Sequence, residues 1–177
     1  GTTTSTPSFL GPPVGTLSGR CGSGASSGTL PTLTPPRRLA WRWCGPSAPW
    51  GGRLEGTIYG DGSGKRGQYR RLRRCGWGIA TISDRNVYTA KVHGPLPGWQ
   101  QDVPLAESFA FLMALRLAAT RCDFVTDCRF VLDTFQAGPS HSSTGWFVYA
   151  ALWRAIWHHV DDIGADQVTV RWVPDHS

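Results

Sequence analysis

The hydrophobic pattern first changes its period near residue 97, and this change limits the possible folds more than any other feature. Before that point apolar and polar residues alternate, which is typical of strands. After it apolar residues recur every three to four positions, as on the buried face of a helix. The first part predicts strands over 54–59, 75–82 and 86–92, and their short links favour an antiparallel meander.

The second part predicts helices that alternate with strands. Asp102 is a suitable N-cap and Pro104 suits a first helical turn. Gly164 is the expected C-cap of the last helix, whose spacing of Trp146, Trp153 and Trp157 places all three in the core. The expected elements are a helix over 102–119, a strand over 122–126, helices over 128–137 and 146–163, and a strand over 168–172. The order β-β-β-α-β-α-α-β predicts an α/β domain with a mixed five-stranded sheet flanked by helices.

The first 36 residues differ from the rest because Gly, Pro, Ser and Thr dominate them. Such a segment cannot bury enough apolar surface to offset its ordering entropy. Over 37–43 arginines alternate with Leu and Trp, which suits a short docking segment or a basic arm. We therefore expect a flexible leader over 1–52 and a folded domain over 53–177.

Charge is distributed unevenly around a net value of +6. Residues 51–93 carry a net +6 and residues 94–177 a net −4, so a basic surface is expected beside a carboxylate-rich region. Nucleic acid is the natural partner of the basic surface, although solubility alone also explains an excess of arginine. Four arginines between the first two strands are the candidates for phosphate contacts, with a solvated hairpin as the alternative: Arg70, Arg71, Arg73 and Arg74.

Several classes of protein are excluded by what the sequence lacks. No apolar run reaches the roughly 18 residues of a membrane span, and the start does not resemble a signal peptide. The five cysteines form no CxxC pair and have no zinc-like spacing to histidine. We expect free thiols in a reducing compartment, and hence an intracellular protein, nuclear or cytoplasmic, that is not secreted and has no membrane partner.

Three acidic residues stand at positions where an acid is locally unexpected. Asp61 follows the first strand, Asp127 follows the fourth, and Glu107 interrupts an apolar run early in the first helix. If these two strands are parallel neighbours, their carboxyl ends meet and the helix can bring the glutamate to them. Three converging carboxylates repel one another, and a hard divalent cation would relieve this. Two such ions about 4 Å apart can promote phosphodiester cleavage.

Each acid also has an ordinary structural explanation. Asp61 could be the turn residue of an Asp-Gly pair. Asp127 could be the N-cap of the next helix, and Glu107 could be an early helical acid favoured by the helix dipole. Taken together, in this order and on these elements, they favour a shared site.

Four short motifs resemble the landmarks of type 1 ribonuclease H, in that family's order. They are Gly60-Asp61-Gly62-Ser63, Ala106-Glu107, Thr126-Asp127-Cys128 with the apolar residues after it, and Trp172-Val173-Pro174-Asp175-His176. The resemblance covers about residues 54–177. It implies the ribonuclease H-like fold and magnesium-dependent (or manganese-dependent) cleavage of the RNA strand of RNA–DNA hybrids, with two ions in an intact site.

The resemblance also implies roles for individual residues. Asp61 would bridge both ions, Glu107 and Asp127 would complete the metal site, and His176 would match the family's mobile histidine. The family's fourth carboxylate lies beyond that histidine, on a further helix that this sequence does not contain. We therefore expect a chain truncated at its C-terminus, with Asp175 as a crude substitute ligand, weak metal binding and poor cleavage by residues 1–177.

The sequence leaves three functions open. The leading one is a metal-dependent endoribonuclease, and the Pro/Ser/Thr-rich leader favours a retroelement-encoded domain attached to other parts of a polyprotein. The second is an inactive ribonuclease H-like module that binds nucleic acid. The third is a transposase or integrase core, against which the early position of Glu107 argues, because those enzymes place their glutamate late.

Overall fold

The computed structural model describes residues 53–65, 68–69, 71–83, 85 and 87–174, together with the backbone of a short strand over 42–44. Six strands form one sheet in the order β1-β4-β3-β2-β5-β6. The strands are β1 (Arg42–Cys44), β2 (Thr57–Lys65), β3 (Arg74–Ile82), β4 (Tyr88–Pro95), β5 (Cys122–Thr126) and β6 (Val168–Trp172). Strands β1 to β4 pair antiparallel, whereas β5 and β6 join β2 in parallel, so the sheet is mixed as expected.

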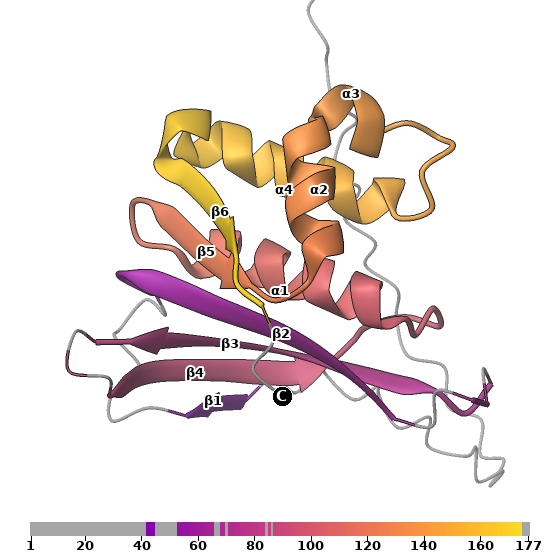
Figure 1. Cartoon of the computed structure of the whole chain (residues 1–177), viewed down its shortest axis with the longest axis horizontal. Coiled ribbons are helices and arrows are strands. Elements are labelled where there is room, and N and C mark those ends of the chain that lie inside the picture. Colours follow the sequence, from indigo (N-terminus) through magenta and orange to yellow (C-terminus); the bar gives the residue numbers. More distant parts are fainter. Residues whose placement is uncertain are drawn as a thin grey trace, which may run out of the picture. The chain divides into compact units, whose positions relative to one another are not determined.

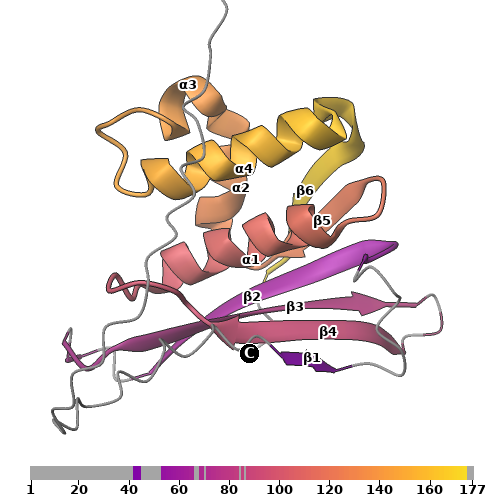
Figure 2. The same ribbon diagram turned by 180° about the vertical axis from the view of Figure 1, so that it is seen from behind.

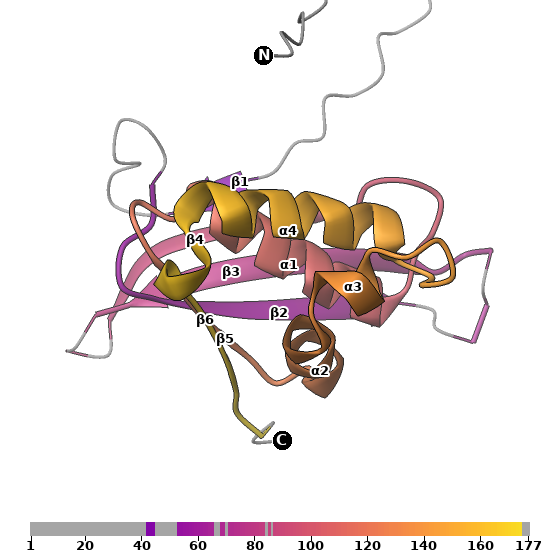
Figure 3. The ribbon, with the colours of Figure 1, turned by 90° about the horizontal axis from the view of Figure 1, so that it is seen from above.

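Helices cover one face of this sheet (Figure 1). Helix α1 (Val103–Leu117) packs on β2 and β3, and α4 (Ala150–Ile163) packs on α1, as the reverse view also shows (Figure 2). Helix α2 (Arg129–Ala137) contacts α1 and the strands β5 and β6, and α3 (Pro139–Ser142) and η1 (Ala165–Gln167) are short connections. Seen from above, α4 runs along α1 while α2 lies to one side (Figure 3). No helix in the described part of the chain has both the length and the apolar character required to cross a bilayer.

The core lies between the sheet and the helices because the apolar residues follow the expected periods. Strand β3 alternates buried and partly exposed residues, and α1 and α4 turn their apolar faces toward the sheet and one another. Phe111 of α1 lies at the centre, 4.9 Å from the ring of Phe124 and 6.2 Å from that of Trp153. Burial of these large side chains is the main source of stability.

The structure differs from the sequence-based expectation in five elements. Strand β2 does not end before Asp61 but continues through it to Lys65, because β3 supplies hydrogen-bonding partners along its whole length. The third expected strand starts and ends later, at Tyr88–Pro95. The segment 139–142 forms a helical turn of its own, and α4 starts at Ala150 rather than at 146. Strand β1 adds a sixth strand from the segment expected as a docking segment or basic arm.

Trp146 is the clearest error of the helical pattern. It precedes the first turn of α4, so it cannot share that helix's buried face, and it is 98% exposed. Trp153 is fully buried as predicted, and Trp157 is partly buried and donates a hydrogen bond to Ser142 Oγ at 2.7 Å. Gly164 ends α4 with φ of +101°, a conformation that favours glycine, as the C-cap assignment predicted.

Candidate metal centre

Asp61 and Asp127 come together because their strands are parallel neighbours. The pairing of β2 with β5 ends at Gly60 and Thr126, and the next residue of each chain segment is the aspartate. Strand β2 therefore extends past Asp61, beyond the strand end that the sequence predicted. The two aspartates still meet, because the parallel pairing of β2 with β5 ends just before both of them. Both carboxylates are exposed at this edge.

Glu107 reaches the same point from the second turn of α1. Its side chain is only 4% exposed, whereas Asp61 and Asp127 face solvent. The three carboxylates offer oxygen atoms that all lie within 4.8 Å of one another. Helix α1 can approach β2 this closely because Gly62 has no side chain: a Cβ there would lie 2.7 Å from the Glu107 backbone nitrogen.

The electrostatics of Glu107 are unusual for a glutamate. Burial, first of all, raises its pKa from 4.5 to about 8, and the charges of Asp61 and Asp127 add to the rise. Hydrogen bonds from the Gly62 backbone and the Thr126 hydroxyl oppose it. One of its oxygens, Oε2, is buried and has no hydrogen-bond partner within the described structure.

These observations exclude the ordinary explanation of each acid. Asp61 lies in a paired strand opposite Gly78 and not in a turn. The N-cap of α2 is Cys128, whose backbone N–H donates to Thr126 Oγ1 at 3.1 Å, so Asp127 does not cap that helix. Glu107 lies beyond the first turn of α1 and is buried, so the helix dipole does not explain it.

The donor set fits a hard divalent cation. Such ions prefer carboxylate oxygens, and a buried oxygen without a hydrogen-bond donor is stabilised when a cation meets it. A second group in the described chain, made of His158, His159 and Asp162 at the end of α4, offers mainly nitrogen donors and is a different kind of cluster. The carboxylate group is therefore the candidate magnesium or manganese site.

Three residues of the sequence motifs support the site in ways that the motifs did not predict. Trp172 of β6 donates from Nε1 to the Asp127 backbone oxygen at 2.8 Å, which fixes the peptide that carries this carboxylate. Thr126 accepts a hydrogen bond from Cys128 while its own hydroxyl hydrogen serves Glu107. Gly62 was detectable in principle, because a glycine inside a strand often marks the close approach of another backbone.

The remaining predicted site residues separate into two groups. Arg71, Arg73 and Arg74 lie at the tip of the β2–β3 hairpin, beside the start of α1. Asp102 is the N-cap residue of α1 as predicted, but its side chain pairs with Arg73 at 2.9 Å instead of capping the helix. Arg70, Asp175 and His176 lie outside the described residues, so their predicted roles stay predictions.

Comparison with known proteins identifies the architecture. No protein-family model matches the sequence, and no curated protein matches it. Among solved structures, the crystal structure of LC9-RNase H1, a type 1 RNase H with the type 2 active-site motif, superimposes with a TM-score of 0.52 at 19% identity. That match covers 68% of this chain and 63% of LC9-RNase H1.

The solution structure of the PFV RNase H domain gives a similar result. Its TM-score is 0.52 at 22% identity, over 71% of this chain and 82% of that domain. Both matches have a probability of 1.00, and the mixed sheet with helices packed on it is the α/β architecture that the sequence motifs led us to expect. The chain therefore has the ribonuclease H-like fold.

Proposed function

We propose that this protein is a metal-dependent endonuclease that hydrolyses the RNA strand of RNA–DNA hybrids. The observation that carries the proposal is the convergence of Asp61, Glu107 and Asp127 within 4.8 Å, with a buried and unpartnered oxygen on Glu107. A buried carboxylate beside two others is unfavourable without a cation, and a bound divalent ion would relieve the repulsion among them.

The chain's own groups would divide the work by position. Asp61 lies on β2, the strand that pairs with β5 and packs against α1, and it would hold the ions together with Glu107 and Asp127. The bound ions would supply an activated water and stabilise the leaving oxygen of the phosphodiester. Trp172 and Thr126 hold Asp127 and Glu107 in place, so that little rearrangement is needed when the ions bind.

Substrate binding is assigned to the basic hairpin. Arg71 and Arg74 are exposed and lie on the same side of the molecule as the start of α1, the helix that carries Glu107. Arginine contacts to phosphates position a nucleic acid without reading its bases. A hybrid or another nucleic acid as partner, a retroelement polyprotein as context and an intracellular location, nuclear or cytoplasmic, all remain parts of this proposal.

The test is cleavage of a labelled hybrid duplex in magnesium or manganese, beside duplex DNA and duplex RNA. We expect weak but hybrid-selective cleavage that Asp61→Asn and Asp127→Asn abolish, each tested for an intact fold. Asp166→Asn, an exposed acid in η1, is the matched control and should cleave normally. Asp175→Asn tests the substitute fourth ligand, since loss of cleavage in that variant would assign it this role.

The alternative is a module of the same fold that binds nucleic acid without cleaving it. It is favoured by the presence of only three gathered carboxylates in the described part of the chain. The alternative predicts tight, salt-dependent hybrid binding with no cleavage in either metal. A transposase or integrase core is disfavoured, because Glu107 lies on the first helix after the meander.

A further inference from the structure

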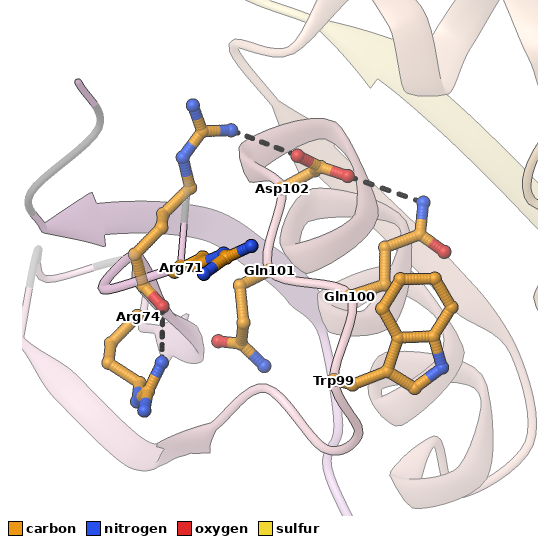
Figure 4. Close-up of a pocket in the computed structure, with 7 residues that line it drawn as sticks. Arg71, Arg74, Trp99, Gln100, Gln101 and Asp102 are labelled. Carbon is orange, nitrogen blue, oxygen red and sulfur yellow. Dashed lines mark hydrogen bonds and ion pairs between the residues drawn. The ribbon is translucent and has the colours of Figure 1, made fainter. Parts of the chain in front are cut away.

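A cavity of about 270 Å³ opens between the β2–β3 hairpin and the loop that leads into α1. Its lining combines cations, amides and one large aromatic side chain (Figure 4): Arg71, Arg73, Arg74, Trp99, Gln100, Gln101 and Asp102. Neither the carboxylate centre nor the fold requires this combination.

The loop that forms one wall is held rigidly by its own side chains. Gln101 accepts a hydrogen bond from the Cys75 backbone N–H at 2.8 Å and donates to the backbone oxygens of Leu96 and Gly98. Asp102 joins this wall to the hairpin through Arg73 at 2.9 Å and accepts a hydrogen bond from Gln100 at 3.2 Å. Both partners of the Arg73–Asp102 pair are about 28% exposed. The cavity is therefore preformed.

Two cations in the cavity are left to meet a ligand. Arg71 is exposed and takes part in no ion pair among the described residues. Arg74 is also exposed and donates a hydrogen bond to the Arg73 backbone oxygen at 2.8 Å. Figure 4 shows Arg74 on one side, Arg71 between it and the loop that carries Gln101, and the Trp99 indole on the other side of that loop. Guanidinium groups in this arrangement suit phosphate oxygens.

The Trp99 side chain favours an unpaired nucleic acid over a duplex as the ligand of this cavity. Its side chain is 90% exposed, so its ring offers an open π-face. Bases inside a duplex already stack on their neighbours, whereas an unpaired base can stack on an aromatic side chain. A phosphate-tracking surface for a duplex needs the arginines but not the indole.

The cavity is also close enough to the carboxylates to act on the same substrate. Arg74 is four residues along β3 from Gly78, the partner of Asp61, which corresponds to roughly 13 Å at the rise of a strand. A nucleic-acid strand passing the carboxylates would reach this distance within a few nucleotides.

We propose that this cavity binds an unpaired stretch of nucleic acid next to the duplex, with phosphates on Arg71 and Arg74 and a base stacked on Trp99. The inference rests on the proposed function for the class of ligand, and it adds that the preferred substrate is a hybrid with a single-stranded extension.

The experiment measures the affinity of Asp127→Asn protein, which is intended to bind without cleaving, for three hybrids of equal duplex length. One is blunt, one has a 5′ and one a 3′ single-stranded extension of a few nucleotides. We expect one extension to tighten binding at least about fivefold, the lower end of what one stacked base contributes. Trp99→Ala and the double variant Arg71→Ala/Arg74→Ala should remove that gain.

Matched variants separate stacking and local charge from general effects. Trp99→Phe should keep most of the gain, because it keeps an aromatic face. Arg85→Ala in the β3–β4 turn and Trp146→Ala, at another highly exposed tryptophan, should leave the gain unchanged. Equal affinity for all three hybrids, or equal weakening of blunt and extended hybrids by Trp99→Ala, would overturn the inference.

The two proposals fail in distinguishable ways. If the wild-type chain cleaves hybrids but extensions bring no gain, the cavity inference is wrong and the nuclease stands. If extended hybrids bind through Trp99 and no metal promotes cleavage, the cavity inference is supported and the nuclease proposal is wrong.

Discussion

The buried carboxyl of Glu107 lowers the free energy of unfolding when it is ionised. Its raised pKa means that the folded state holds a proton on this carboxyl more tightly than the unfolded state does. The stabilising effect of that proton is complete below about pH 4.5 and is lost as the pH rises toward 8. Without a metal ion, the site therefore lowers stability at neutral and alkaline pH, as functional sites often do.

Replacing this carboxyl should stabilise the metal-free protein while removing its function. We expect Glu107→Gln to raise the free energy of unfolding at pH 8 by roughly 2 kcal/mol, and by much less at pH 5. Urea denaturation in the presence of a chelator at pH 5 to 8 measures this. Glu55→Gln, at an exposed glutamate outside the site, is the control and should follow the wild-type pH dependence. Parallel stability curves for Glu107→Gln and wild type would contradict the prediction.

Gly62 has no side chain, and this allows the backbone of α1 to pack closely on β2. A Cβ at this position would lie 2.7 Å from the Glu107 nitrogen and 3.0 Å from the Ala106 carbonyl carbon, which are backbone atoms of α1. We expect Gly62→Ala to lower stability by about 1–3 kcal/mol and to weaken metal binding, because α1 must move away from β2. Chemical denaturation and calorimetric titration with manganese measure the two effects.

Gly145→Ala provides the control for any general effect of removing a glycine. No atom lies within 4 Å of the added Cβ at that position. Its stability should remain within about 0.5 kcal/mol of wild type, as for most surface substitutions. Equal losses in both variants would show that the close packing of α1 on β2 is not the cause.

At the scale of elements, the side chain of one aspartate links the parallel strands β2, β5 and β6, in addition to their backbone pairing. Asp123 of β5 accepts hydrogen bonds from Arg171 of β6 at 2.7 and 3.0 Å and from Thr57 of β2 at 2.9 Å. The bonds from Arg171 are the main cause of its lowered pKa. Strand β2 contains Asp61, β6 contains Trp172, and β5 ends just before Asp127. The Asp123 side chain thus connects the three strands that position the metal centre.

This connection should make the sheet sensitive to acid. The contribution of ionised Asp123 is present above the ordinary aspartate pKa of 3.8 and is lost as the pH falls through its lowered value. We expect Asp123→Asn to cost about 1 kcal/mol at pH 7, with a smaller difference from wild type near pH 3. Asp133→Asn, which breaks the exposed Arg129–Asp133 pair, should cost less than about 0.5 kcal/mol. A pH-independent loss in Asp123→Asn would show that packing, not charge, is responsible.

At the scale of the whole molecule, a basic middle segment and an acidic C-terminal half are brought side by side. Asp61 and the hairpin arginines come from the basic segment, whereas Glu107 and Asp127 come from the acidic one, and α1 connects their positions. In the proposed function, an extended anion would be held by the hairpin arginines while one of its phosphates meets the metal ions at the carboxylates.

Binding of a hybrid should accordingly weaken steeply with salt. We expect Arg71→Ala/Arg74→Ala to reduce the slope of log affinity against log salt by about one to two, since each lost phosphate contact removes nearly one released counterion. Arg73 is paired with Asp102, so Arg73→Ala should change the slope less. Filter binding between 50 and 300 mM salt measures this, with Arg85→Ala as the control for losing one exposed arginine elsewhere. An unchanged slope in the double variant would identify the hairpin as a solvated surface only.

Local patterns in the sequence determined most of the fold. Periods of two and 3.6 residues predict the element types because burial on one face is a property of neighbouring residues. The bounds were less accurate where tertiary pairing decides them. Strand β2 extends past Asp61 because β3 lies beside it, and Trp146 is exposed because α4 starts only at Ala150.

The candidate site shows the same division. The sequence by itself indicated Asp61, Glu107 and Asp127, since each is an acid in a locally apolar or glycine-rich setting and their order resembles a known family. Only the tertiary structure decided that their oxygens lie within 4.8 Å, that Glu107 is the buried member, and that Trp172 holds Asp127. It alone placed Trp99 beside the hairpin arginines. The physical reason is that distance and desolvation depend on which elements pack together, and residues far apart in the chain do not encode this in any local pattern.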